Sequence, residues 1–203
     1  MCTAVIASCV AIQSARAETI VDEWASVKVP PSPTLKAVTI DKKTTVLLML
    51  DFVEQTCQPQ RRPRCIASIP KVKLLLTAAR AAGVPVVFSV VPGAKPADIL
   101  TDVAPAADEP VVSAGVDKFV GTELENILKQ KGAQTVIVVG TAAHGAVLYT
   151  ASAAAIRGMK AIIPVDGMSA DIPYVEQYVA WHLANVPILG SAMTLTTLAD
   201  VKF

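Results

Sequence analysis

The sequence predicts a three-layer α/β/α fold in which helices cover both faces of a central parallel sheet. Apolar, strand-like runs alternate along the chain with segments of helical periodicity. Hydrophobic residues make up 53% of the chain and aromatic residues only 4%, which is typical of buried parallel strands and closely packed helices. A length of 203 residues suits one well-buried domain.

The first strand is expected over residues 45–50, a continuous apolar run that ends at Asp51. A helix is expected over residues 66–82, with Gly83 as its stop signal and Val84 opening the next strand. Further strands are expected over residues 84–90, 135–140, 160–165 and 193–196, and further helices over residues 122–130, 145–157 and 173–185. Thr122 is expected to be the N-cap of its helix.

The N-terminus predicts export. Residues 1–17 form an apolar stretch ending in Ala-Arg-Ala, a pattern that a signal peptidase cuts, here before Glu18. Two other interpretations remain: a frayed helix of the domain, and a lipoprotein signal that would leave Cys9 as a lipid anchor. Residues 18–44 are expected to be an extended, proline-containing lead-in to a domain over residues 45–203. The predicted location is the periplasm.

Cys57 and Cys65 flank a loop rich in proline and arginine that has no apolar anchor. A disulfide between them is predicted, which suits an oxidising compartment. Their spacing is not that of a metal-binding C-x2-C motif, and neither His144 nor His182 lies nearby in the sequence. The spacing therefore does not favour a metal site at these cysteines.

The charge balance favours small-molecule or protein partners over nucleic acid. Lysine and arginine number 18 against 17 acidic residues, without a basic run interleaved with aromatics. After the predicted signal, no segment approaches the ~20 apolar residues that cross a bilayer. The sequence has neither a dinucleotide fingerprint nor a phosphate-binding loop, so no cofactor is expected. The small residues over 151–156 permit close subunit packing, and a homo-oligomer is expected.

Ligands of parallel α/β sheets bind beyond the carboxyl ends of the strands, where the strand order reverses. Asp51 closes the first expected strand and Gly140 closes a later one. If these strands are neighbours, Asp51 and the loop over residues 141–146 face one crevice. A carboxylate there indicates a functional site, although it could instead cap a loop.

Over residues 45–195 the sequence resembles the isochorismatase-like cysteine hydrolases, which include nicotinamidases and N-carbamoyl amide hydrolases. The resemblance rests on four segments taken in order: LLMLD ending at Asp51, LLTAARAAGVPV from Leu75, DKFVGTEL from Asp117 and GTAAHGAVLYTA from Gly140. It implies an isochorismatase-like, Rossmann-like fold and hydrolysis of a C–N bond in a small amide or related carbonyl compound. The histidines of the zinc-containing nicotinamidases are missing after Phe88, so the resemblance implies no metal here.

The resemblance also implies a cysteine nucleophile at a helix N-terminus, an aspartate that takes its proton and a lysine that polarises the site. Asp51 matches the aspartate, but Ala146 stands at the nucleophile position and Ala114 at the lysine position, with Lys118 nearby. The oxyanion and ligand-binding loop would be formed by Ala142, Ala143, Gly145 and Ala146.

Three interpretations of Ala146 compete: a substitution introduced to trap substrate, natural divergence with other catalytic residues, and natural divergence to a protein that only binds. The change of the usual threonine to Ala143 and of the lysine to Ala114 favours divergence. Asp51, Lys118 and His144 are the candidate catalytic residues. His144 is included because it lies two residues before the vacant position and histidine is a common acid–base group in catalysis. A solvated Lys118 and a backbone-bonded His144 are the alternatives, and His182 is expected to be structural or to lie at a subunit interface.

Overall fold

The computed structural model describes residues 19–203 and divides the chain into two units, residues 1–31 and 32–203. The predicted signal peptide over residues 1–17, with Cys2 and Cys9, lies outside the described residues. In the described part of the first unit, a one-turn helix, α1 (Ile20–Glu23), interrupts the segment that was expected to be extended. Asp22 accepts a hydrogen bond from the Thr19 N–H at 2.8 Å, and this bond closes the turn.

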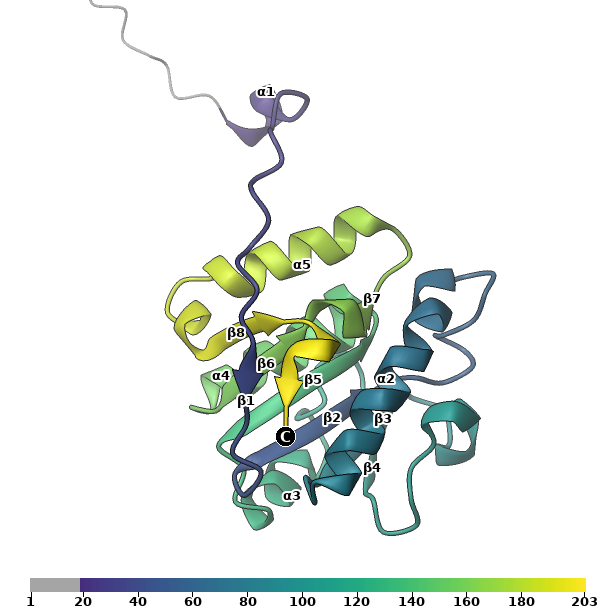
Figure 1. Cartoon of the computed structure of the whole chain (residues 1–203). Helices are drawn as coiled ribbons and strands as arrows, with labels where there is room; N and C mark the ends of the chain where they lie inside the picture. Colours follow the sequence, from purple (N-terminus) through teal and green to yellow (C-terminus); the bar gives the residue numbers. More distant parts are fainter. Residues whose placement is uncertain (1–18) are drawn as a thin grey trace, which may run out of the picture. The chain divides into compact units, whose positions relative to one another are not determined.

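The second unit is built on a parallel sheet (Figure 1). Its strands are β2 (Thr45–Leu50), β3 (Val86–Val90), β4 (Val111–Ser113), β5 (Thr135–Thr141), β6 (Lys160–Pro164), β7 (Met168–Ser169) and β8 (Met193–Thr196). Their order is β4-β3-β2-β5-β6-β8, β7 pairs with the end of β5, and all these pairings are parallel. The central parallel sheet predicted from the sequence is confirmed.

Helices cover both faces of the sheet and bury two apolar cores. One face is covered by α2 (Pro63–Ala81) (Figure 1). Its Val72 and Leu76 belong to the same apolar core as Met49 and Phe88. On the other face, α3 (Leu124–Gln130), α4 (Leu148–Ile156) and α5 (Pro173–Asn185) pack against residues that include Leu48. We refer to these as the α2 face and the α4 face. The two faces and the sheet make the three predicted layers.

The expected and observed elements differ mainly at their ends. α2 begins at Pro63, because proline suits the first turn of a helix. α3 begins at Leu124 with Glu123 as its N-cap, so the N-cap expected at Thr122 is wrong, although Thr122 Oγ1 accepts a hydrogen bond from the Leu124 N–H at 3.2 Å. The helix expected from residue 145 begins as a π turn, η3 (Ala143–Val147).

β4 was not predicted, because three residues are too few to show a period. Short 3-10 turns are η1 (Pro96–Asp98), η2 (Thr101–Val103), η4 (Val165–Gly167), η5 (Leu189–Ala192) and η6 (Leu198–Asp200).

The lead-in joins the domain before residue 45. β1 (Val38–Thr39) and β9 (Val201–Lys202) form a two-stranded parallel sheet, and the Ile40 N–H donates to the Lys202 carbonyl at 3.0 Å. The Lys36 N–H donates to the Leu195 carbonyl at 2.9 Å. Part of the expected lead-in is therefore ordered by the C-terminal strand.

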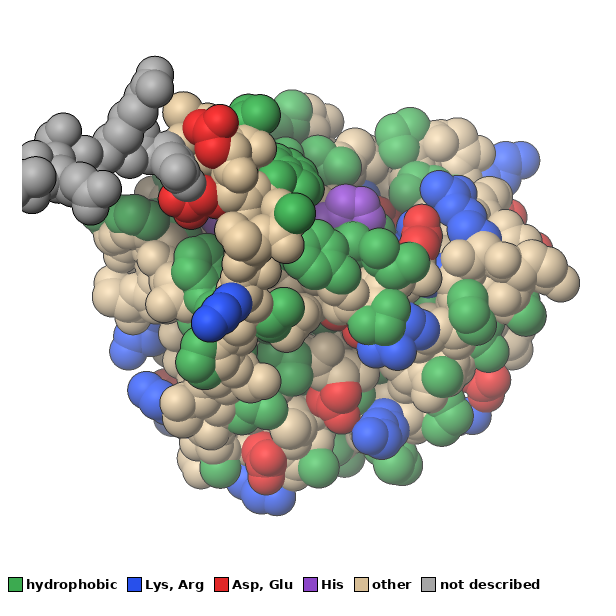
Figure 2. Space-filling model, turned by 90° about the horizontal axis from the view of Figure 1, so that it is seen from above, with side chains coloured by type: hydrophobic (Ala, Val, Ile, Leu, Met, Phe, Trp, Pro, Cys, Tyr) green, Lys and Arg blue, Asp and Glu red, His purple; other side chains and the backbone are tan. Residues whose placement is uncertain are grey.

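Two further features bear on partners. Helix α4 buries Ala151 and Ala154 in the core of its own chain, so these small residues are not available for subunit packing. Within residues 19–203, no helix combines the length and apolar character needed to cross a membrane. Acidic and basic side chains are interspersed on the face shown in Figure 2.

Candidate functional site

The candidate site begins where β2 and β5 end side by side. Leu50 pairs with Gly140, so Asp51 and Thr141 leave the sheet as neighbours. β2 also separates the β3–β4 half of the sheet from the β5–β6–β8 half, which makes this the point where strand order reverses. A Cβ atom at Gly140 would lie 2.3 Å from the Leu50 carbonyl oxygen, so only glycine allows the two strands to approach here.

Asp51 and Lys118 form a buried ion pair at this edge. Lys118 Nζ lies 2.7 Å from Asp51 Oδ2, and the two side chains are 0% and 5% exposed. Ser89 Oγ donates to the other oxygen, Asp51 Oδ1, at 2.7 Å. Lys118 Nζ also donates to the carbonyls of Gly115 at 2.7 Å and Ala114 at 3.0 Å. These three contacts account for all the N–H groups of a protonated lysine.

Burial is the main influence on the Asp51 carboxyl. It raises the pKa of Asp51, while the charge and hydrogen bond of Lys118 and the hydroxyl of Ser89 act in the opposite direction. A carboxylate with a raised pKa is a better proton acceptor near neutral pH than an exposed one. The arrangement retains an acid–base group and its counter-charge.

The lysine reaches this position from an unexpected place in the chain. The family resemblance places the lysine at residue 114, which is Ala114 here, whereas Lys118 lies four residues later. The ammonium of Lys118 nevertheless binds the carbonyl of Ala114. The polar end of the side chain therefore returns to the backbone of the expected position, and the solvated interpretation of Lys118 is wrong.

The loop that follows β5 carries Ala146, the residue that the family resemblance aligns with the nucleophile. The Thr141–Ala142 peptide bond is cis, and the π turn η3 continues into α4. Ala143 and Ala146 are buried in the core of the α4 face. The Gly145 N–H donates to the Ala142 carbonyl at 3.0 Å, so it is engaged within the loop. The loop thus provides fewer free backbone donors than a regular helix N-terminus would.

The two histidines lie apart from the Asp51–Lys118 pair. His144 is exposed, and its charge is one of the smaller contributions that lower the pKa of Asp171. His182 is half-buried on α5, with its ring centroid 5.9 Å from that of Tyr178. In residues 19–203, no group of three or more histidine, cysteine or acidic side chains is arranged to hold a metal ion.

A charged residue missed by the sequence analysis, Arg62, lies on the α2 face of the same edge. Its side chain is only 4% exposed, and Nε donates to Asp171 Oδ1 at 2.6 Å. Nη1 donates to Thr141 Oγ1 at 2.9 Å and to the Thr56 carbonyl at 3.2 Å. The sequence signal was weak, because Arg62 is one of three arginines in a loop that reads as solvent-exposed.

Cys57 and Cys65 form the predicted disulfide, with an S–S distance of 2.00 Å. The cross-link closes the loop that carries Arg62 and joins it to the first turn of α2. Both cysteines are buried. The disulfide therefore fixes the chain on either side of the buried arginine.

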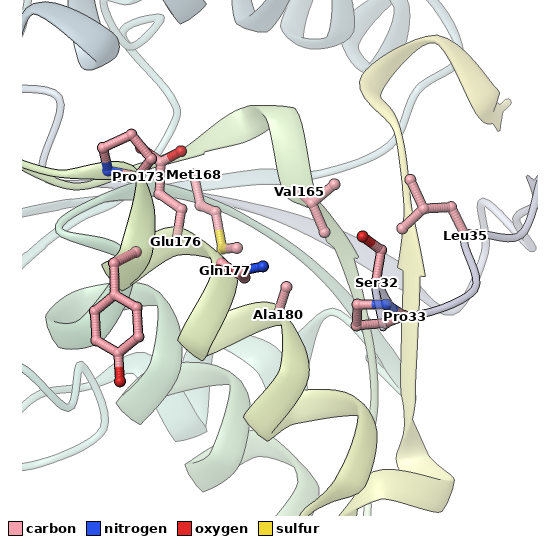
Figure 3. A pocket seen from close by; sticks show the side chains of 10 residues that line it. Ser32, Pro33, Leu35, Val165, Met168, Pro173, Glu176, Gln177 and Ala180 are labelled. Carbon is pink, nitrogen blue, oxygen red and sulfur yellow. The ribbon is translucent and has the colours of Figure 1, made fainter. Parts of the chain in front are cut away.

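A groove of about 570 Å³ lies between α5 and the segment from Ser32 to Leu35. Figure 3 shows Ser32 and Pro33 on one side of it and Gln177 and Ala180 on the other. Its acidic residue, Glu176, already binds Arg64 and the Ala170 N–H. None of the predicted site residues lines this groove, so it is separate from the candidate site.

Comparison with known proteins places these features in context. Residues 45–196 match the family model of the isochorismatase domain. The chain is 30% identical over 187 residues to a secreted isochorismatase effector, Isc1, from Verticillium dahliae, covering 86% of this chain and 94% of the relative.

Two solved structures share the fold. A cysteine hydrolase from Pseudomonas syringae pv. phaseolicola has a TM-score of 0.71 and 19% identity, covering 84% of this chain and 96% of the other. The N-carbamoylsarcosine amidase from Thermoplasma acidophilum has a TM-score of 0.65 and 22% identity, covering 76% of this chain and 96% of the other.

Proposed function

We propose that this chain, which belongs to the isochorismatase family, binds a small carbonyl compound at the switch point of its sheet without thiol chemistry. One observation carries the proposal: the Asp51–Lys118 ion pair is retained, whereas Ala146 occupies the nucleophile position. A methyl group forms no covalent intermediate, but the buried pair still polarises the edge of the sheet. A divergent site of this kind favours ligand binding over turnover.

The bonding of the pair supports the same conclusion. The N–H groups of Lys118 are directed at Asp51 and at two backbone carbonyls, and Asp51 also accepts from Ser89. The two charged groups therefore stabilise one another and their own backbone. Asp51 keeps further lone pairs that can accept a hydrogen bond from the N–H of an amide ligand. The family neighbour that acts on a carbamoyl compound makes a small amide the first class to test.

A second candidate function is hydrolysis by a water molecule that Asp51 activates in the space left by the missing thiol. The raised pKa of Asp51 favours this alternative. We assign the role of base to Asp51 rather than to His144, because His144 is exposed and lies within electrostatic reach of Asp171.

A panel of small amides and ureides separates the two functions. Each compound is tested for binding by protein-observed NMR and for ammonia release, using the wild type, Asp51→Asn and the exposed control Asp108→Asn. Binding without ammonia release, lost in Asp51→Asn and kept in Asp108→Asn, supports the binding function. Ammonia release that requires Asp51 supports the hydrolase. If the wild type neither binds any of the compounds nor releases ammonia from them, both functions are contradicted.

We also propose that the chain is exported, with the periplasm as its compartment. The buried disulfide suits an oxidising compartment, and the relative from Verticillium dahliae is described as secreted. Expression with the native N-terminus, followed by fractionation and N-terminal sequencing, tests this. A mature chain beginning at Glu18 outside the cytoplasm is expected, and an uncleaved cytoplasmic chain contradicts it.

We further propose a homo-oligomer whose interface includes α5. Support comes from three aromatic side chains that α5 leaves exposed, Tyr174, Tyr178 and Trp181. Light scattering coupled to size-exclusion chromatography measures the mass. The wild type is expected to exceed one chain and Trp181→Glu to approach one chain, whereas a monomeric wild type excludes the oligomer.

A further inference from the structure

A second polar cluster lies at the same edge of the sheet but on the α2 face, opposite the Asp51–Lys118 pair. It is formed by Arg62, Thr141 and Ser169, which come from the start of α2, the end of β5 and β7. The side chains of all three are at least 95% buried. Buried polar groups in folded proteins are almost always bonded, so any that is not requires an explanation.

Ser169 is the unexplained member of this cluster. Its Oγ is buried and is the one side-chain polar atom within residues 19–203 that is buried without a hydrogen-bond partner. Leaving a buried hydroxyl unpaired is unfavourable. A serine at this position is therefore most simply explained by a group that binds to it and is not part of the chain.

The sheet register places Ser169 next to Arg62. Ser169 pairs with Thr141 in the parallel ladder, so their side chains point to the same face. The neighbours of Ser169 on its strand, Met168 and Ala170, belong to the core of the α4 face, which directs Ser169 to the α2 face. Thr141 Oγ1 accepts a hydrogen bond from Arg62 Nη1 at 2.9 Å. Arg62 and Ser169 thus flank the same threonine.

Arg62 retains donors for a ligand. Its hydrogen bonds to residues 19–203 use Nε and Nη1, which leaves the two N–H groups of Nη2. The side chain of its acidic partner, Asp171, is 52% exposed, so a ligand from solvent can replace the Asp171 carboxylate at the guanidinium. A ligand carboxylate can receive both Nη2 and the Ser169 hydroxyl, a pairing that suits the geometry of arginine.

We propose that Arg62 and Ser169 form a binding site for the carboxylate of a small molecule, in which Asp171 competes with the ligand for the guanidinium. A single negative charge fits better than the double charge of phosphate, because Asp171 already neutralises one of the nearby arginines, Arg61 and Arg62. The Lys118 N–H donates to Thr150 Oγ1 of α4 at 3.3 Å, which places Lys118 on the α4 face. Arg62 and Ser169 lie on the α2 face, so their site goes beyond the proposed carbonyl-binding function.

The test is an NMR titration of the disulfide-bonded full chain with sodium acetate, with sodium chloride at equal ionic strength as the reference and inorganic phosphate as a parallel arm. Acetate is expected to shift the Arg62 Nε–H and Ser169 amide signals saturably, and phosphate to bind more weakly. Ser169→Ala is expected to weaken acetate binding roughly tenfold, the loss typical of one hydrogen bond to a charged group. Asp171→Asn is expected to tighten it roughly fivefold, because the competing charge is removed.

Arg64→Gln is the matched control. Arg64 binds Glu176 on the surface, so this variant is expected to bind acetate as the wild type does. Arg62→Gln is expected to abolish binding. If Arg62→Gln does not fold, Ser169→Ala and Asp171→Asn still decide the question. If Arg62 and Asp171 form only a structural ion pair and Ser169 binds nothing, acetate will cause no saturable shift in the wild type or in Asp171→Asn. That result would overturn the proposal, and so would acetate binding by Ser169→Ala that equals the wild type.

Discussion

At the scale of single residues, the pairing of Asp51 with Lys118 dominates the site. Removing one partner leaves the other charge buried and unpaired, and such losses typically cost about 3–5 kcal/mol of stability. We therefore expect Asp51→Asn and Lys118→Met each to lower the free energy of unfolding by that amount. The double variant is expected to recover most of the loss, because no unpaired charge then remains.

Urea unfolding of the wild type, both single variants and the double variant measures this coupling. Lys118 and Asp51 are buried, so the coupling energy between them is expected to persist at high salt. Additive losses in the double variant would mean that the two groups do not stabilise one another.

The ion pair of Asp171 with Arg62 predicts a dependence of stability on pH. The hydrogen bond from Arg62 is the largest cause that lowers the pKa of Asp171, with smaller contributions from Arg61 and His144. Because the pKa is lower in the folded state, the carboxylate stabilises the fold above its unfolded pKa of about 3.9. This stabilisation is lost as the pH falls from the pKa of the unfolded state through the lower pKa of Asp171 in the folded state.

The wild type and Asp171→Asn are compared by urea unfolding from neutral pH to acid. The difference in their unfolding free energies is expected to be constant above the unfolded pKa and to shrink below it. A difference that grows toward acid would have the wrong sign for this ion pair.

Residue-level reasoning from the sequence found Asp51 because a carboxylate directly after a buried strand is conspicuous. It left Lys118 undecided and overlooked Arg62 and Ser169. The reason is physical: the burial of Arg62 depends on β7 and Asp171, which lie more than a hundred positions away in the chain. Periodicity describes only the local environment of a residue.

At the scale of elements, the approach of β2 to β5 depends on Gly140. An added methyl group would meet the Leu50 backbone at 2.3 Å, and backbone cannot move aside as a side chain can. Gly140→Ala is expected to lower the free energy of unfolding by about 1–3 kcal/mol, as overpacked cores do. Gly115→Ala is the control, since nothing lies within 4 Å of a Cβ at that position. Equal stability of the two variants in urea would show that the strands are not so closely apposed.

The disulfide is a second element-scale feature. Closing the short loop from Cys57 to Cys65 stabilises the fold by about 2–3 kcal/mol in the chain-entropy model. Replacing both cysteines by alanine is expected to lower the unfolding free energy by that amount. Mass spectrometry before and after reduction checks the bond itself, and two free thiols in exported protein would contradict it.

Strands and helices with strong patterns were predicted closely. The helix Pro173–Asn185 and the strand Met193–Thr196 have the predicted bounds, because a proline start and an apolar run mark them locally. The π turn Ala143–Val147 overlaps the start of the helix predicted over residues 145–157, since its i→i+5 hydrogen bonding leaves no trace in hydrophobic spacing. The parallel pair β1–β9 joins the two ends of the domain, and no local pattern specifies such a contact.

At the scale of the whole molecule, the chain keeps the family fold, and the proposed function implies that its reaction centre has changed. The order of the strands places Asp51, Lys118 and the loop after β5 at one edge, as in a functional α/β site. The position that the family resemblance assigns to the nucleophile carries Ala146. The central claim of the proposed function is that the Asp51–Lys118 pair still serves this position, so that a thiol placed there would be activated.

Ala146→Cys tests this claim most directly, through the rate of its alkylation by iodoacetamide at neutral pH, located by peptide mapping and compared with a free thiol. Asp51 is expected to take the proton of the thiol while Lys118 balances the charge, so Cys at position 146 should react faster than the free thiol, and adding Asp51→Asn should remove the advantage. A thiol at position 146 that reacts no faster than a free thiol, with or without Asp51, would contradict the claim.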